Sequence, residues 1–355
     1  MRALKSRRSF PPRTCPTPFT WRGCCRTTDP ASSRPSTARS TAATNAPWKT
    51  IGVASARYEE EGLVEFSGRT WRPAFERWTP VIEATSGCAW GRCAFCTLYE
   101  QERFRVVPLE RFCRDLDELK AVVPSARRLW LTGGDPFQMG FRHLEDRALA
   151  VRDRLIKMQT IAMFASVRDI KRYSDRELHR LSLLRVGGLV IGMESVDDRT
   201  LALAGKGYTA RDVTEQCLRL ERAGMEYSLI YMTGLAGDGR GRATARRTVE
   251  AVNNLRPRFF GTTSLTIFPG SRFERRVREG SFATASEAER IDELIELVRG
   301  LSFRTFFDAR SPTNAIPVAG LLPYDRDRIL ATLDHARTHI DEDALAAYRR
   351  ELREP

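Results

Sequence analysis

A short apolar run followed by a stretch of helical periodicity recurs along most of the chain, from Pro80 to about Phe268. The runs are apolar throughout rather than alternating, which is typical of parallel strands buried on both faces. Repeated β-α units of this kind predict one α/β domain built on a parallel sheet. The expected strands are residues 80–85, 128–132, 160–167, 188–193, 227–232 and 259–268.

Helices are expected between these strands, at residues 109–121, 143–158, from 174 onward, 209–223 and 243–255. Ser174 stands three residues before Glu177, which is the spacing of a capping box. Gly224 follows the fourth helix, where a left-handed glycine commonly ends a helix. After Glu274 the pattern changes to charged helices, at about 286–300 and 325–350. We expect a helical C-terminal appendage there rather than another barrel unit.

Most of the net charge of +13 belongs to residues 1–50, which hold ten Lys or Arg and one acid. This stretch is rich in Arg, Ser, Thr and Pro and has no structural period, so a disordered basic tail is expected. The remaining +4 does not by itself predict a nucleic-acid partner. The expected division is therefore a tail (1–50), an N-terminal extension (51–79), a core barrel (80–275) and the appendage (276–355).

No apolar run approaches the roughly 20 residues that a membrane helix needs. The pair Arg7-Arg8 is followed by Pro, Arg, Thr and Cys rather than by the apolar segment of an export signal. We therefore expect a cytoplasmic protein without a membrane partner. In a reducing compartment its eight cysteines would stay free or bind metal, and Cys113 and Cys217, on expected helices, are interpreted as small core residues.

Cys88, Cys93 and Cys96 lie just after the first strand with the spacing Cys-x4-Cys-x2-Cys. A structural zinc site normally takes four protein ligands, and no fourth cysteine or histidine is close by in the sequence. A [4Fe–4S] cluster held by three thiolates fits better, because its fourth iron stays open for a substrate or cofactor. A structural zinc ion and buried free thiols are the alternatives.

Other unusual residues also follow strands. Gly133-Gly134-Asp135 follows the second strand, Glu194 ends the fourth, and Gly234 follows the fifth. Because the reactive groups of parallel α/β barrels gather at the C-terminal strand ends, we expect these residues to share one site with the cysteines. Taken alone, the Gly-Gly-Asp sequence would be an ordinary turn and Glu194 a buried salt-bridge partner.

These motifs together resemble those of the radical S-adenosylmethionine (SAM) enzymes. The pattern is most similar to the group containing the elongator catalytic subunit, tRNA methylthiotransferases and oxygen-independent coproporphyrinogen oxidase. The resemblance covers about Pro80 to Glu274 and implies a partial (β/α)6 barrel. The commonest family spacing is Cys-x3-Cys-x2-Cys, and this loop has one more residue, so the resemblance favours cluster binding more strongly than any one subfamily.

The resemblance implies that Cys88, Cys93 and Cys96 ligate a [4Fe–4S] cluster whose open iron binds SAM. It would place Phe95 against the SAM adenine. It would also place Gly234, the first residue of a glycine-rich turn, near the same ring.

For the rest of SAM, the resemblance implies that Gly133 and Gly134 let the backbone approach the methionine moiety, since neither carries a Cβ. Asp135 would accept a hydrogen bond from the ammonium group. Glu194 would bond the ribose hydroxyls, and Lys206 would reach the carboxylate. A solvated surface charge is the alternative for Lys206.

The chemistry implied is reductive cleavage of SAM to methionine and a 5′-deoxyadenosyl radical, which takes a hydrogen atom from the substrate. We therefore predict a radical SAM enzyme with a flavodoxin- or ferredoxin-type electron donor and an unidentified substrate, either a small molecule or tRNA. No catalytic residue is predicted beyond the cluster ligands. The alternative is a non-catalytic iron–sulfur or zinc-binding barrel protein.

Overall fold

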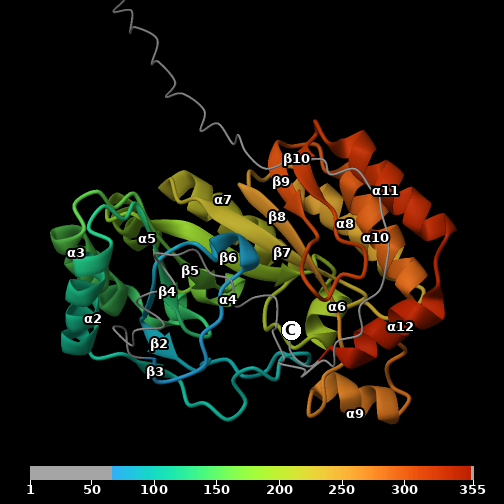
Figure 1. The fold of residues 1–355 in the computed structure, drawn as a ribbon, viewed down its shortest axis with the longest axis horizontal. Helices are drawn as coiled ribbons and strands as arrows, with labels where there is room; N and C mark the ends of the chain where they lie inside the picture. The colour runs from blue at the N-terminus through green and yellow to red at the C-terminus, as the bar shows by residue number, and fades with distance from the viewer. Residues whose placement is uncertain (1–65, 353–355) are drawn as a thin grey trace, which may run out of the picture. The chain divides into compact units, whose positions relative to one another are not determined.

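The computed structural model describes residues 66–352, so the predicted tail and most of the N-terminal extension lie outside the described residues. The centre of the described part is an eight-stranded sheet in the order β1-β4-β5-β6-β7-β8-β9-β10 (Figure 1). Neighbouring strands are parallel except for the antiparallel pair β9 and β10. The strands are β1 (Val81–Glu83), β4 (Arg128–Thr132), β5 (Thr160–Ala165), β6 (Val186–Glu194), β7 (Tyr227–Thr233), β8 (Phe259–Ser264), β9 (Thr305–Asp308) and β10 (Ala319–Leu322).

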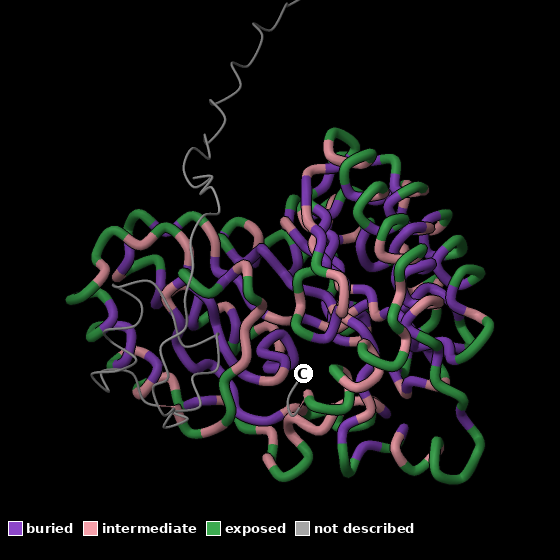
Figure 2. The backbone as a smooth tube through the Cα atoms, turned by 45° about the vertical axis from the view of Figure 1, so that its right-hand side comes forward, coloured by how far each residue is buried: buried purple, intermediate pink, exposed green. Residues whose placement is uncertain are grey.

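Helices cover the outside of this sheet (Figure 1). Short helical turns are η2 (Ala74–Glu76), η3 (Pro136–Met139), α4 (Val167–Ile170) and α6 (Asp198–Leu203). The longer helices are α2 (Leu109–Val122), α3 (Phe141–Arg154), α5 (Asp175–Leu183), α7 (Ala210–Ala223), α8 (Gly241–Val252), α9 (Arg272–Arg278), α10 (Glu287–Gly300), α11 (Arg326–Thr338) and α12 (Glu342–Glu351). The strands are buried, whereas the outward turns of the helices are exposed (Figure 2).

The predicted fold class, a partial barrel with β-α alternation, is confirmed. All six expected strands form. Their residues are apolar because the sheet is buried on both faces. The capping box is also present, because Ser174 accepts from the backbone of Glu177 and the Glu177 side chain accepts from the backbone of Ser174. Gly224 ends α7 with a left-handed φ of 72°. Cys217 is fully buried and Cys113 packs against the core, as expected.

The C-terminal segment, expected as a helical appendage, also contains two strands that were not predicted. β9 pairs in parallel with β8, and β10 returns antiparallel to β9, so the C-terminal segment extends the sheet as well as adding helices. Stacking stabilises this addition, since the ring of Phe307 lies 6.2 Å from that of Phe260. The strands were missed because each has only four residues and a polar, proline-containing loop separates them.

Two helix boundaries also differ from expectation. The helix expected at 143–158 ends at Arg154. The helix expected at 325–350 is two helices, because Asp341 starts α12 by accepting a hydrogen bond from the backbone of Ala344.

Candidate active site

The three cysteines lie in a loop whose base is closed by a small ribbon. β2 (Thr85–Ser86) and β3 (Arg105–Val106) pair antiparallel and bring the two ends of the loop together. The loop thus leaves the sheet at the C-terminal end of β1, where chemistry is expected in this fold. Cys88, Cys93 and Cys96 are each half-buried and none forms a disulfide.

The turn after β4 packs directly on this loop. The backbone N–H of Gly134 donates to the carbonyl oxygen of Gly87 at 3.1 Å. A Cβ on Gly134 would lie 2.4 Å from that oxygen and 2.9 Å from Cβ of Cys88. Gly133, with φ of +141°, similarly has no room for a Cβ beside Thr85. Contact with the cysteine loop is therefore one physical reason for two glycines here.

The turn between α6 and α7 holds the loop from another side. The backbone N–H of Ala94 donates to the carbonyl oxygen of Ala204 at 2.9 Å, and Nε1 of Trp90 donates to that of Gly205 at 2.8 Å. The loop is thus held at the edge of the sheet by these two hydrogen bonds, by the β2–β3 ribbon and by the Gly134 contact.

In the side-chain conformations of this structure, no three His, Cys, Asp or Glu residues between 66 and 352 are arranged to hold a metal ion. The thiols are nevertheless within electrostatic reach of one another. Burial raises the pKa of Cys93, and negative charge at Glu194 and Cys88 raises it further. Burial likewise raises the pKa of Cys96 to about 11, with contributions from Cys93 and Cys88. Because rotation about side-chain bonds redirects a thiol without moving the backbone, the loop is compatible with a shared ligand.

Glu194 and Lys206 form a buried ion pair beside the loop. Nζ of Lys206 lies 3.1 Å from Oε1 of Glu194, so the interpretation of Lys206 as a solvated surface charge is wrong. Burial alone would lower the pKa of Lys206, but the charges of Tyr208, Glu194 and Cys93 raise it well above its usual value. The lysine is therefore a fixed positive charge, and it lies 5.5 Å from the ring centre of Phe95.

Asp135 is paired with a second carboxyl group. Burial and the neighbouring charge of Asp169 raise the pKa of Asp135 well above its usual value. Burial would also raise the pKa of Asp169, but hydrogen bonds from Arg168 and Ser166 lower it overall. The two carboxyl groups are thus coupled, with the pKa of Asp135 raised and that of Asp169 lowered. Gln138 connects this pair to the cysteine loop, since its Nε2 donates to Asp169 at 3.0 Å and its Oε1 accepts from the backbone of Ala89 at 2.9 Å.

Two carboxyl oxygens in this region, Oδ1 of Asp135 and Oε2 of Glu194, are buried without a hydrogen-bond partner among the described residues. Buried acceptors without donors are unfavourable, so each is suited to a polar group of a bound ligand. Glu194 also has a left-handed backbone φ of 60°, which residues other than glycine rarely adopt. Three thiols, two free carboxyl oxygens and a fixed ammonium group suit a [4Fe–4S] cluster and the hydroxyl, amino and carboxylate groups of SAM.

Phe95 and the turn at Gly234 meet in a small apolar cluster beneath the loop. Its buried members are Ala94, Ala204, Leu235, Leu265, Phe273 and Phe282, and Phe95 packs against them. Gly234 has φ of +74°, and a Cβ there would lie 2.2 Å from the guanidinium of Arg290. Phe95 and Leu235, the residue that follows Gly234, thus belong to one apolar cluster.

Sequence reasoning missed several residues of this region. Asp169 and Arg168 follow β5 directly, so the rule that selected Glu194 could have found them. The ring of Trp90 lies 5.1 Å from the guanidinium of Arg92 and 4.1 Å from that of Arg168. Asn314 is buried and donates to the carbonyl oxygens of Thr262 and Ala309.

A hollow of about 480 Å³ lies elsewhere, between the first turns of α3 and α5. None of the predicted site residues lines it.

No helix between residues 66 and 352 combines the length and the hydropathy of a membrane span.

Residues 82–240 match the family model described as "Radical SAM superfamily". No curated protein matches the chain.

Solved structures similar to this chain include three with low sequence identity. The radical S-adenosylmethionine methyltransferase TsrM from Kitasatospora setae, with cobalamin and a [4Fe–4S] cluster bound, is 17% identical with a TM-score of 0.48, and the match covers 61% of this chain and 41% of TsrM. The archaeal Elp3 of Methanocaldococcus infernus is 14% identical with a TM-score of 0.43, over 62% of this chain and 54% of that one. Methylornithine synthase (PylB) is 14% identical with a TM-score of 0.46, over 76% and 84%. The match to TsrM thus spans less than half of that protein, and these scores support no functional argument.

Proposed function

Because residues 82–240 form a radical SAM domain, we propose that the chain is a radical SAM enzyme. When bound, a [4Fe–4S] cluster would supply the electron that cleaves SAM to methionine and a 5′-deoxyadenosyl radical, which abstracts hydrogen from the substrate. Cys88, Cys93 and Cys96 are the proposed cluster ligands. The observation that carries this proposal is that the three-cysteine loop lies at the C-terminal strand ends with the unpartnered oxygens of Asp135 and Glu194.

The unpartnered oxygen of Glu194 would accept from the ribose hydroxyls of SAM, while its other oxygen keeps the pair with Lys206. Lys206 would attract the SAM carboxylate through its fixed positive charge. Phe95 and the Gly234 turn would contact the adenine and exclude water from it. Gly133 and Gly134 would leave room for the methionine moiety as well as for the cysteine loop.

Asp135 would bind the ammonium group of SAM at its free Oδ1. Burial and the charge of Asp169 raise the pKa of this carboxyl group, and a cation at Oδ1 would oppose that rise by favouring the ionised form. The hydrogen bonds of Gln138 would hold the carboxyl pair in register with the cysteine loop.

We also propose that residues 80–275 form the core barrel and that 276–355 complete its sheet and cover one side of its mouth. The electron donor would be a flavodoxin or ferredoxin type of protein, and the enzyme would work in the cytoplasm. The substrate is proposed only by class, as a small molecule or a tRNA.

Anaerobic reconstitution with iron and sulfide tests the proposal. After addition of dithionite and SAM, we expect 5′-deoxyadenosine from the unmodified chain and none from Cys93→Ala. Cys113→Ala is the matched control, because Cys113 lies on α2 and should retain iron and turnover. Iron binding without 5′-deoxyadenosine would support the non-catalytic iron–sulfur alternative, and zinc binding in place of iron would support a zinc-binding barrel.

A further inference from the structure

Arg290, in the first turn of α10, is a buried cation at the edge of the sheet where the parallel strands end. Only 4% of the residue is exposed. Its Nη1 donates to the carbonyl oxygen of Thr233 at 3.3 Å and to Oγ of Ser264 at 3.1 Å. These are the last residues of β7 and β8.

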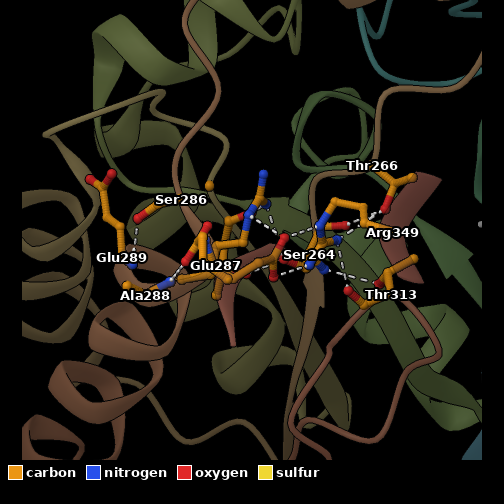
Figure 3. A network of polar contacts seen from close by, with 12 residues as sticks. Ser264, Thr266, Ser286, Glu287, Ala288, Glu289, Thr313 and Arg349 are labelled. Carbon is orange, nitrogen blue, oxygen red and sulfur yellow. Dashed lines mark hydrogen bonds and ion pairs between the residues drawn. The ribbon is translucent and has the colours of Figure 1, made fainter. Parts of the chain in front are cut away.

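No carboxylate among residues 66–352 accepts a hydrogen bond from Arg290. The nearest is Glu287, whose Oε1 lies 3.6 Å from Nε of Arg290, and Nε has no hydrogen-bond partner there. Both oxygens of Glu287 are occupied by Arg349, which donates from Nε at 2.5 Å and from Nη2 at 2.6 Å. Figure 3 shows this network around Glu287, Arg349 and Ser264.

The other nearby acid also has different partners. Glu293 accepts from the hydroxyl of Tyr231 and from the backbone N–H of Gly234, each at 2.6 Å. Burial raises the pKa of Glu293 to about 7, so near neutral pH it carries only part of a negative charge. The two acids near Arg290 thus make their hydrogen bonds to other groups.

A buried charge without a hydrogen-bonded counter-ion is unfavourable, so such a cation favours the binding of an anion. A guanidinium binds carboxylates through charge-assisted hydrogen bonds, and the free Nε–H of Arg290 could donate to one carboxylate oxygen.

A small cavity adjoins this cation. It is lined by polar groups of Thr233, Ser264, Glu287, Arg290, Asn314 and Arg349, and by Ile291, Leu294, Ala315 and Ile316. Its free space is about 10 Å³, enough for roughly one water-sized group. One oxygen of a planar carboxylate fits that space with the rest of the group outside it, whereas a tetrahedral phosphate is bulkier around each of its oxygens.

We propose that Arg290 and Ser264 bind a carboxylate group of the substrate. The inference rests on the proposed function, which locates the reaction at this edge of the barrel, and it narrows the substrate class to carboxylic acids. Glu287 stays paired with Arg349 and lines one side of the cavity. The substrate carboxylate would therefore approach the part of the Arg290 guanidinium that has no hydrogen-bond partner. The site is separate from Lys206, which the proposed function assigns to the SAM carboxylate.

The test uses the full chain without cluster or SAM, and acetate as the probe. At constant ionic strength, acetate should raise the melting temperature saturably, whereas acetamide and phosphate should not. Titration calorimetry with acetate should give an affinity that falls at least about tenfold in Arg290→Gln. Arg246→Gln is the matched control, because Arg246 is an exposed cation on α8 that pairs with Glu296.

A structural role for Arg290 is distinguished by the melting temperature without acetate. If the cation lacks a counter-ion, Arg290→Gln should leave that temperature unchanged or raise it. Ser264→Ala, which keeps the cation, should weaken acetate binding by a smaller factor. The proposal is overturned if acetate does not bind the unmodified chain, if Arg290→Gln binds it equally well, or if phosphate stabilises the chain as much as acetate does. Absence of 5′-deoxyadenosine in the reconstitution assay would refute the proposed function without affecting acetate binding.

Discussion

Nζ of Lys206 lies 3.1 Å from Oε1 of Glu194, and 9% of each side chain is exposed. The pair joins the end of β6 to the turn before α7, on the side where the cysteine loop is anchored. A buried pair with good geometry roughly balances the desolvation of its two ions, but removal of one partner leaves the other charge uncompensated. The two residues are therefore coupled whether or not a ligand is bound.

Lys206→Met should lower the free energy of unfolding by about 3 kcal/mol, because it leaves Glu194 buried without a cation. The double variant Lys206→Met with Glu194→Gln should recover part of that loss, which chemical denaturation can measure. Lys171→Met is the control, since Lys171 pairs with Asp212 at 2.7 Å but is 60% exposed; it should cost clearly less stability than Lys206→Met. Equal losses for Lys206→Met and Lys171→Met would contradict the coupling.

Gly134→Ala should displace the cysteine loop, because its Cβ would meet the carbonyl oxygen of Gly87 at 2.4 Å. We expect a loss of about 1–3 kcal/mol in stability from this overpacking and less than half the iron per chain after reconstitution. Gly187→Ala is the control, since its Cβ would meet nothing closer than 3.6 Å. Full iron incorporation in Gly134→Ala would show that the loop does not depend on this contact.

Local sequence patterns were sufficient for the six-stranded part of the sheet, because runs such as Leu129-Trp130-Leu131 are buried on both faces. They also predicted that the cysteine loop, Asp135 and Glu194 would lie at one edge of the sheet, and all of them follow strands that end there. The strands β9 and β10 were missed because pairing with β8, rather than local propensity, stabilises four-residue segments.

Partners within the site depend on tertiary contacts and could not be predicted. No second carboxyl group was predicted beside Asp135, but β5 and α4 bring Asp169 there, and burial together with the charge of Asp169 raises the pKa of Asp135. The glycines at 133 and 134 were interpreted as room for a ligand or as an ordinary turn, and they also make room for Thr85 and Gly87. Nothing in the sequence marked Arg290 as a candidate site residue, because an arginine on a charged helix is typically exposed.

Glu293 should make the stability of the fold depend on pH. Its pKa is raised by burial to about 7 in the folded chain, against an ordinary value of 4.5. The folded state therefore binds the proton more tightly than the unfolded state, and stability should fall as pH rises from about 4.5 to about 7, by about 3 kcal/mol in total. Glu293→Gln should remove this component, which urea denaturation at a series of pH values can measure. A slope unchanged in Glu293→Gln would mean that another group carries the pH dependence.

Helix α12 is attached to the remainder of the chain by polar contacts, since none of its residues is buried. The carboxylate of Glu342 accepts from the backbone N–H groups of Glu287 and Ala288 at 2.6 and 3.0 Å, which caps the start of α10. Glu342→Ala should remove about 1 kcal/mol of that attachment, so amide hydrogen exchange across 342–351 should quicken about fivefold. Glu351→Ala, at the other end of the same helix, should leave the exchange rate unchanged. If both variants exchange alike, or if neither differs from the unmodified chain, the Glu342 contact does not hold α12 in place.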